Sequence, residues 1–142
     1  MIHHEPFEFE LGRAEVLASG SDALIVACGV MVSVALSARE RLAAEGISVA
    51  VINSSSIKPL DREGILAAAE NVDLVVTAEE HQIIGGLGSA VCELLAEESP
   101  RRVVRVGVDD RFGQSGKADE LLSHYGLDVD GLVTAVKAGL SG

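Results

Sequence analysis

The chain has 142 residues, 48% of them apolar, with 22 acidic and 11 basic side chains. This length predicts one soluble domain, because no apolar run approaches the roughly 20 residues that span a bilayer. The net charge of −11 repels phosphate groups, so we expect neither nucleic acid nor a membrane surface as a partner.

The first residues have the pattern of a linker. They lack a signal peptide, and Pro6 is followed by the alternating Phe7 and Phe9, as in an extended strand. We therefore expect a linker segment over residues 1–12, a domain over residues 13–142 and a longer parent protein.

Two strand-type segments open the domain, Ala14–Ala18 and Ala23–Cys28. The residues between them, Ser19–Asp22, are small and polar, as in turns. This pattern predicts a hairpin-like or otherwise antiparallel start.

A helix and a buried strand follow. Val34, Ala38 and Leu42 recur every four residues until Gly46, which predicts an amphipathic helix. The next segment, Ile47–Ile52, is nearly all apolar and β-branched, as in a parallel strand that is covered on both faces. We expect this strand near the centre of a sheet.

The same alternation continues to the end of the chain. Asp61 is suited to cap a helix whose apolar positions are Ile65, Leu66 and Ala69. Further strands are expected at Asp73–Ala78 and Val103–Val108, and further helices from Gly85–Ser89 to Pro100, from Ser115 or Gly116 to Gly126, and after Asp128. Strands that alternate with helices predict a three-layer α/β/α sandwich with a mostly parallel sheet.

Polar residues follow the predicted strands at their carboxyl ends, where open α/β sheets bind ligands. In the triplet Glu79-Glu80-His81, two carboxylates beside an imidazole could act as a general acid and base. Alternatively, one Glu caps or bridges to a neighbouring element, and His81 makes a contact between domains. The sequence leaves both interpretations open.

The glycine-rich segment Gly85–Ser89 could hold an anion at the start of a helix. Two of its glycines have the spacing of a dinucleotide-binding turn, and Asp109 follows about twenty residues later, where a ribose-binding acid would stand. Against this, Val91 takes the place of the third glycine, and Glu80–Ile84 separate the strand from the turn. The alternative is that the glycines allow close packing against a neighbouring backbone or subunit.

Metal and hydrolase sites are not expected. His3, His4 and His124 have no ligand spacing with each other or with the two cysteines. Cys28 and Cys92 stand singly in apolar segments, which predicts buried free thiols in a cytoplasmic protein. The three serines that follow Asn53 lack the Gly-x-Ser-x-Gly pattern of a nucleophile elbow.

Taken together, several segments resemble the C-terminal domain of transketolase. They are Asp22–Gly29, Ser56–Asp61, Ala78–His81, Gly85–Val91 and Asp110–Gly116. The resemblance runs from about Phe7 to Leu140 and is greatest to transketolases encoded as two half-chains. Deoxyxylulose phosphate synthase and the beta subunit of 2-oxo acid dehydrogenases share some of these motifs, whereas the last one favours transketolase. Half-chain transketolases often carry a histidine where this chain has Ser55 or Ser56.

The resemblance implies a five-stranded mixed sheet of order 1-3-2-4-5, with strand 1 antiparallel at an edge. In this order the second and fourth strands lie side by side, so their carboxyl ends would share a cleft. The candidate cleft or interface residues are Gly29, Met31, Glu79, Glu80, His81, Gly85, Gly86, Gly88, Asp110, Arg111 and Phe112. Of these, His81 and Glu80 are the catalytic candidates.

The resemblance also implies that thiamine diphosphate and Mg²⁺ bind between two other domains of a dimeric, cytoplasmic enzyme of pentose phosphate metabolism. This chain has no Gly-Asp-Gly motif, and its only asparagines are Asn53 and Asn71. We therefore expect no cofactor or metal site here and an isolated chain that is inactive. It would be an accessory domain that shapes the dimer and closes the side of the active site. A stand-alone nucleotide- or anion-binding module is the alternative from another class.

Overall fold

The computed structural model describes residues 14–54, 60–82, 86–108 and 128–141, and for residues 80–82 and 108 the backbone alone. Its strands are β1 (Glu15–Ala18), β2 (Ala23–Ala27), β3 (Val49–Asn53), β4 (Leu74–Gln82) and β5 (Arg102–Val108). Its helices are α1 (Met31–Ala44), α2 (Arg62–Ala69), α3 (Leu87–Glu98) and α5 (Val129–Ser141). Among these residues, no helix is long and apolar enough to cross a membrane.

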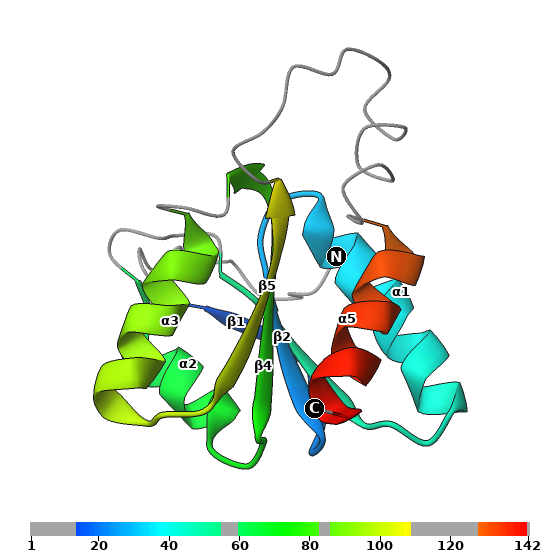
Figure 1. Ribbon diagram of the computed structural model, residues 1–142, viewed down its shortest axis with the longest axis horizontal. Helices are drawn as coiled ribbons and strands as arrows, with labels where there is room; N and C mark the ends of the chain where they lie inside the picture. Colours follow the sequence, from blue (N-terminus) through cyan, green and yellow to red (C-terminus); the bar gives the residue numbers. More distant parts are fainter. Residues whose placement is uncertain (1–13, 55–59, 83–85, 109–127, 142) are drawn as a thin grey trace, which may run out of the picture.

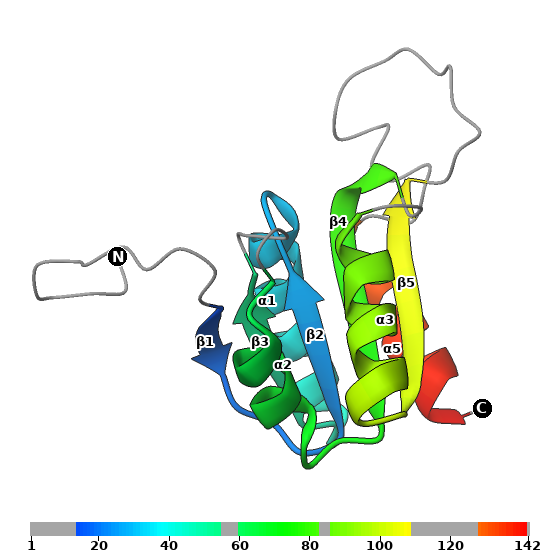
Figure 2. The same ribbon diagram turned by 90° about the vertical axis from the view of Figure 1, so that its left-hand side faces the viewer.

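The strands form one sheet of order β1-β3-β2-β4-β5, in which only β1 is antiparallel to its neighbour. Helices α1 and α5 cover one face and α2 and α3 the other, which gives the three predicted layers (Figures 1 and 2). The predicted fold and strand order are confirmed. The domain boundary at residue 13 stays a prediction, and residues 1–12 lie outside the described part.

The first strand is antiparallel to its neighbour, as predicted, but that neighbour is β3 and not β2, so the hairpin-like interpretation was wrong. The connection between β1 and β2 crosses the start of β3. A Cβ atom on Gly20 would lie 2.2 Å from the carbonyl carbon of Val49, which leaves room only for glycine. Two reciprocal hydrogen bonds between Ser48 and Asp22 stabilise the crossing. The Ser48 N–H donates to the Asp22 carboxylate, and the Asp22 N–H donates to the Ser48 carbonyl oxygen, each at 2.7 Å.

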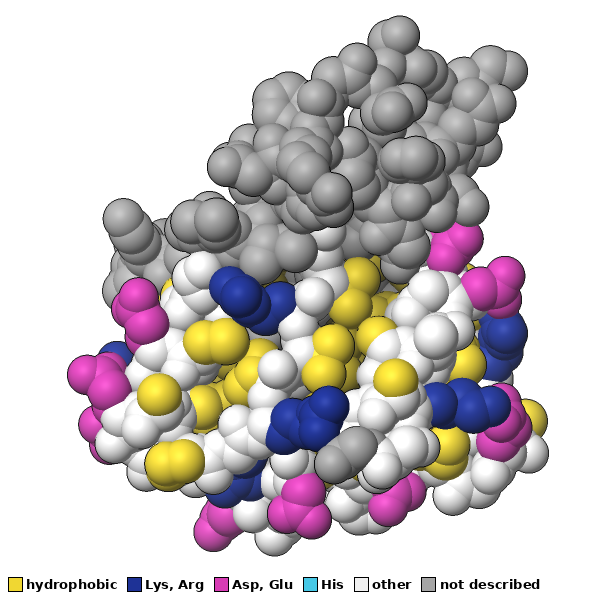
Figure 3. Space-filling model, in the orientation of Figure 1, with side chains coloured by type: hydrophobic (Ala, Val, Ile, Leu, Met, Phe, Trp, Pro, Cys, Tyr) yellow, Lys and Arg dark blue, Asp and Glu magenta, His cyan; other side chains and the backbone are white. Residues whose placement is uncertain are grey.

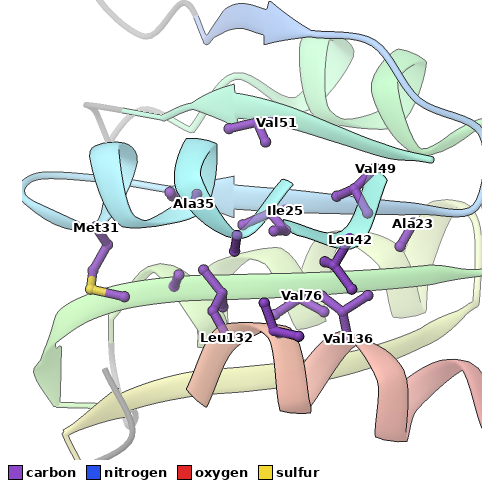
Figure 4. Packing of buried hydrophobic residues seen from close by; sticks show 14 of the residues in the cluster. Ala23, Ile25, Met31, Ala35, Leu42, Val49, Val51, Val76, Leu132 and Val136 are labelled. Carbon is purple, nitrogen blue, oxygen red and sulfur yellow. The ribbon is translucent and has the colours of Figure 1, made fainter. Parts of the chain in front are cut away.

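The core lies on both faces of the central strand β2, whose five residues Ala23–Ala27 are fully buried. On one face, Leu42 of α1, Val76 of β4 and Leu132 of α5 point toward one another (Figure 4). A second cluster fills the space under α2 and α3. A strand that is covered on both faces explains the unbroken apolar runs in the sequence.

The helices follow the predicted patterns with one shift. In α1 the buried positions are Met31, Ala35, Ala38 and Leu42, whereas Val34 is half-buried. A series with a spacing of four drifts away from the 3.6-residue turn, so Val34 lies at the margin of the buried stripe.

The caps of α2 and α5 agree with the sequence. Asp61 accepts a hydrogen bond of 3.0 Å from the Gly64 N–H at the start of α2. Asp128 accepts one of 2.8 Å from the Gly131 N–H at the start of α5. The helix predicted between residues 115 and 126 lies outside the described residues.

The β5 edge of the sheet is basic. Arg102 and Arg105 are exposed on it, and half-buried valines stand between them. Figure 3 shows this face, where apolar and basic side chains reach the surface between α3 and α5. Charged side chains on an edge strand discourage pairing with another strand.

Candidate functional site at the carboxyl edge of the sheet

Strand β4 continues four residues beyond its predicted end at Ala78. Ala78 pairs with Val106 and Gln82 with Val108, so three residues of β4 lie opposite one of β5. This irregularity is a bulge, which bends a strand and redirects its side chains. The triplet Glu79–His81 thus belongs to a bulged strand end, and the prediction that it follows the strand was wrong.

Glu79 is a buried cap of helix α3. The residue is 1% exposed, and its two carboxylate oxygens accept hydrogen bonds of 2.8 and 2.6 Å from the N–H groups of Leu87 and Gly88. The residue before the helix, Gly86, has no side chain that could cap it. A carboxylate at this position satisfies two N–H groups and interacts favourably with the helix dipole. Glu79 therefore has the capping role that the sequence had left open.

This cap bears on the anion-binding alternative. The N–H groups of the first turn of α3 already bind the Glu79 carboxylate. A phosphate group at this helix end would have to displace a buried negative charge or lie against it. The geometry therefore argues against a dinucleotide site at this turn.

Gly88 lets α3 approach the sheet closely. A Cβ atom at this position would lie 2.9 Å from Thr77 Oγ1 and 2.9 Å from the Arg105 Cγ and Cδ atoms. The Thr77 hydroxyl is buried there and has no hydrogen-bond partner among the described residues. The glycine thus allows close packing, but against side chains and not against the neighbouring backbone or subunit that we considered.

The ends of β2, β3 and β4 are joined by backbone hydrogen bonds. The Cys28 N–H donates to the Ala78 carbonyl oxygen at 3.3 Å, and the Ser54 N–H donates to that of Ala27 at 2.9 Å. Gly29 follows with φ of 63°, which favours glycine. Met31 is fully buried in the core and thus does not line a cleft (Figure 4).

The other predicted site residues are described in part or not at all. Glu80 and His81 belong to β4, but their side chains are outside the described part of the structure. Gly85, Asp110, Arg111 and Phe112 lie outside the described residues altogether. Their roles stay predictions.

The thiols and the possible metal ligands can be compared with the prediction only where the structure describes them. Cys28 and Cys92 are not joined in a disulfide and are half-buried, whereas we expected full burial. Within the described ranges, no group of three or more His, Cys, Asp or Glu side chains could hold a metal ion.

Two polar anchors were not predicted from the sequence. The second carboxylate oxygen of Asp61 accepts a hydrogen bond of 2.8 Å from the Ala14 N–H, which ties the start of β1 to α2. Arg101 donates from Nη1 to the carbonyl oxygens of Ala69 and Val72, at the carboxyl end of α2. Neither contact has a local sequence signal, because each joins residues at least 29 positions apart.

The model of the family described as "Transketolase, C-terminal domain" matches residues 12–132. The chain belongs to this family. A 6-deoxy-6-sulfo-D-fructose transketolase subunit of Clostridium sp. is 46% identical over 134 residues, which are 94% of this chain and 42% of that protein. The 1-deoxy-D-xylulose-5-phosphate synthase 1 of Geobacter sulfurreducens is 45% identical over 142 residues, 99% of this chain and 22% of that protein.

Solved structures show the same fold. A split-gene transketolase, described as an inactive β4 tetramer, is 50% identical and superposes with a TM-score of 0.90, over 95% of this chain and 44% of that one. A transketolase of Pichia stipitis at 22% identity and a TM-score of 0.70 shows likeness of fold alone. The family domain thus spans less than half the length of these relatives.

Proposed function

We propose that this chain is the C-terminal, accessory domain of a thiamine diphosphate-dependent transketolase. The complete enzyme transfers a two-carbon ketol unit between sugar phosphates in pentose phosphate metabolism, as a cytoplasmic homodimer. The observation that carries the proposal is the 50% identity and TM-score of 0.90 to a split-gene transketolase over 95% of this chain. The partner is the cofactor-binding part of the same enzyme, within one polypeptide or as a separate half-chain.

The cofactor belongs to that partner. The described residues do not fit a diphosphate group, because Glu79 occupies the start of α3 at the carboxyl edge of the sheet. The sequence also lacks a Gly-Asp-Gly motif for the metal and diphosphate. The domain's contribution is therefore to shape the dimer and to close the side of the active site.

A deoxyxylulose phosphate synthase is the second candidate for the complete enzyme. It is favoured by the 45% identity to the Geobacter sulfurreducens synthase over 99% of this chain. The two enzymes differ in the substrate that supplies the two-carbon unit, so substrate assays can tell them apart.

Substrate assays of the complete enzyme test the proposal. We expect turnover with xylulose phosphate and a sugar phosphate acceptor, and none with pyruvate and a triose phosphate. The reverse pattern would favour the synthase, and turnover with neither pair would refute both. Calorimetry of the isolated chain with thiamine diphosphate and Mg²⁺ should show no heat of binding, whereas micromolar affinity would contradict an accessory role.

His81 provides a separate test, with Glu80 as its neighbour. If His81 contacts substrate in the complete enzyme, His81→Ala should lower kcat without weakening the dimer. If it makes a contact between domains, the same change should weaken assembly, as measured by analytical ultracentrifugation. Glu80→Gln serves to decide whether the adjacent carboxylate is needed for the same step.

A further inference from the structure

A groove of about 520 Å³ lies between the edge strand β1 and helix α2. Most of its walls are small residues, among them Ala18, Ala50, Ala67 and Ala68. Val16 of β1 also lines it and is 66% exposed, more than any other large apolar side chain in the described residues. The domain's own core leaves this apolar surface uncovered.

The two edges of the sheet differ in their side chains. The β5 edge carries Arg102 and Arg105, whereas β1 has the sequence Glu-Val-Leu-Ala, without a basic residue or proline. No described strand lies on the outer side of β1. β1 is short and carries the charged Glu15, which discourages pairing with a further strand, so the exposed Val16 beside the groove favours cover by packed side chains.

The first described residue of the domain lies beside this groove. Ala14 is one of the lining residues, and its N–H group is held by Asp61, 2.8 Å away. The first described residue therefore lies on the β1 side of the sheet, beside the groove. In the relatives, more than half of the protein lies outside the region that matches this chain.

The charges that line the groove indicate which kind of partner fits it. Asp61 and Glu63 line it, and the lining has no lysine or arginine. Two facing copies of this groove would bring like charges together, which disfavours a second copy of the chain. A partner that supplies an apolar segment and a basic side chain is complementary to it.

We propose that the groove between β1 and α2 is the surface on which this domain docks onto the cofactor-binding part of the complete enzyme. That part covers Val16 with an apolar segment and places a basic side chain near Glu63. The inference rests on the proposed function, because it names the contact face of the partner given there.

Thiol protection tests the docking face. Ala67→Cys places a reactive group in the groove, and Ala43→Cys is the matched control, since both positions are exposed on helices and α1 lies on the opposite face of the sheet. Alkylation of each thiol by N-ethylmaleimide is measured by peptide mass spectrometry, once in this chain and once in the complete enzyme. We expect the Ala67→Cys thiol to react slower by about tenfold or more in the complete enzyme, and the control to change little.

The other outcomes overturn the inference in distinguishable ways. Equal alkylation of the Ala67→Cys thiol in both samples excludes this face, and active ketol transfer by the same complete enzyme would leave the proposed function intact. Protection that appears in the chain alone and grows with its concentration identifies a second copy as the occupant. Glu63→Gln, combined with Ala67→Cys, tests the proposed basic side chain of the partner. It should speed alkylation of the Ala67→Cys thiol in the complete enzyme at low salt, and an unchanged rate would contradict the charge complementarity.

Discussion

Replacing Glu79 with glutamine changes a charge and almost no volume at the start of α3. The carboxylate accepts two N–H groups, at 2.8 and 2.6 Å, and hydrogen bonds to charged groups contribute about 1.5–3 kcal/mol each. Glutamine keeps one acceptor and turns an amide N–H₂ group toward the other N–H. Because the neutral amide is easier to bury, part of this loss is offset, and we expect a net loss of about 1.5–3 kcal/mol in the free energy of unfolding.

Alanine at the same position should cost more, about 3–5 kcal/mol, since it leaves two buried N–H groups unsatisfied and a cavity. Urea unfolding followed by far-ultraviolet circular dichroism measures both changes, because the chain has no tryptophan and a single tyrosine. Glu93→Gln, on the exposed side of α3, is the control and should stay within about 0.5 kcal/mol of the parent. A Glu79→Gln protein as stable as this control would refute the capping role.

Three further changes test other contacts by the same unfolding measurement. Thr77→Val removes a buried hydroxyl without a partner and should leave stability unchanged or raise it by up to about 1 kcal/mol; a clear loss would reveal a partner for the hydroxyl. Asp61→Ala should cost about 1–2 kcal/mol and speed hydrogen exchange in β1 more than in β4, whereas an unchanged β1 would show that the tie to Ala14 is unimportant. Arg101→Ala frees two carbonyl oxygens at the end of α2 and should cost about 1–3 kcal/mol; a lysine that fully restores stability would contradict the need for a planar guanidinium.

Local patterns predicted the elements, but not which strands become neighbours. The turn after Ala18 favours a hairpin on its own, and the strand order came from the family resemblance. The physical reason for the true pairing is the crossing at Gly20, where the chain passes over the start of β3 at a distance that excludes any side chain. A glycine in a turn is too common a signal to identify such a crossing.

At the candidate site the sequence indicated the right segments and left their roles open. Glu79, Glu80 and His81 look alike as polar residues after an apolar run, so the pattern ended β4 at Ala78. The bulge that continues the strand, and the choice of Glu79 as the cap, depend on where α3 begins in space. Contacts of this kind, like that of Asp61 with Ala14, join residues of separate elements. They produce no periodic pattern in the sequence, so they cannot be predicted from it.

The Glu79 cap also shows how the start of α3 differs from a nucleotide-binding helix of the same architecture. In dinucleotide-binding domains the helix that follows a glycine turn directs its free N–H groups at a phosphate. Here the N–H groups of Leu87 and Gly88 are satisfied from inside the domain by the carboxylate of Glu79, a residue that is 1% exposed. Because that charge is fixed by two hydrogen bonds, an incoming anion would gain nothing that is not already provided. The N–H groups at the start of α3 thus contribute to the stability of the domain itself, and they are not available to a ligand from outside.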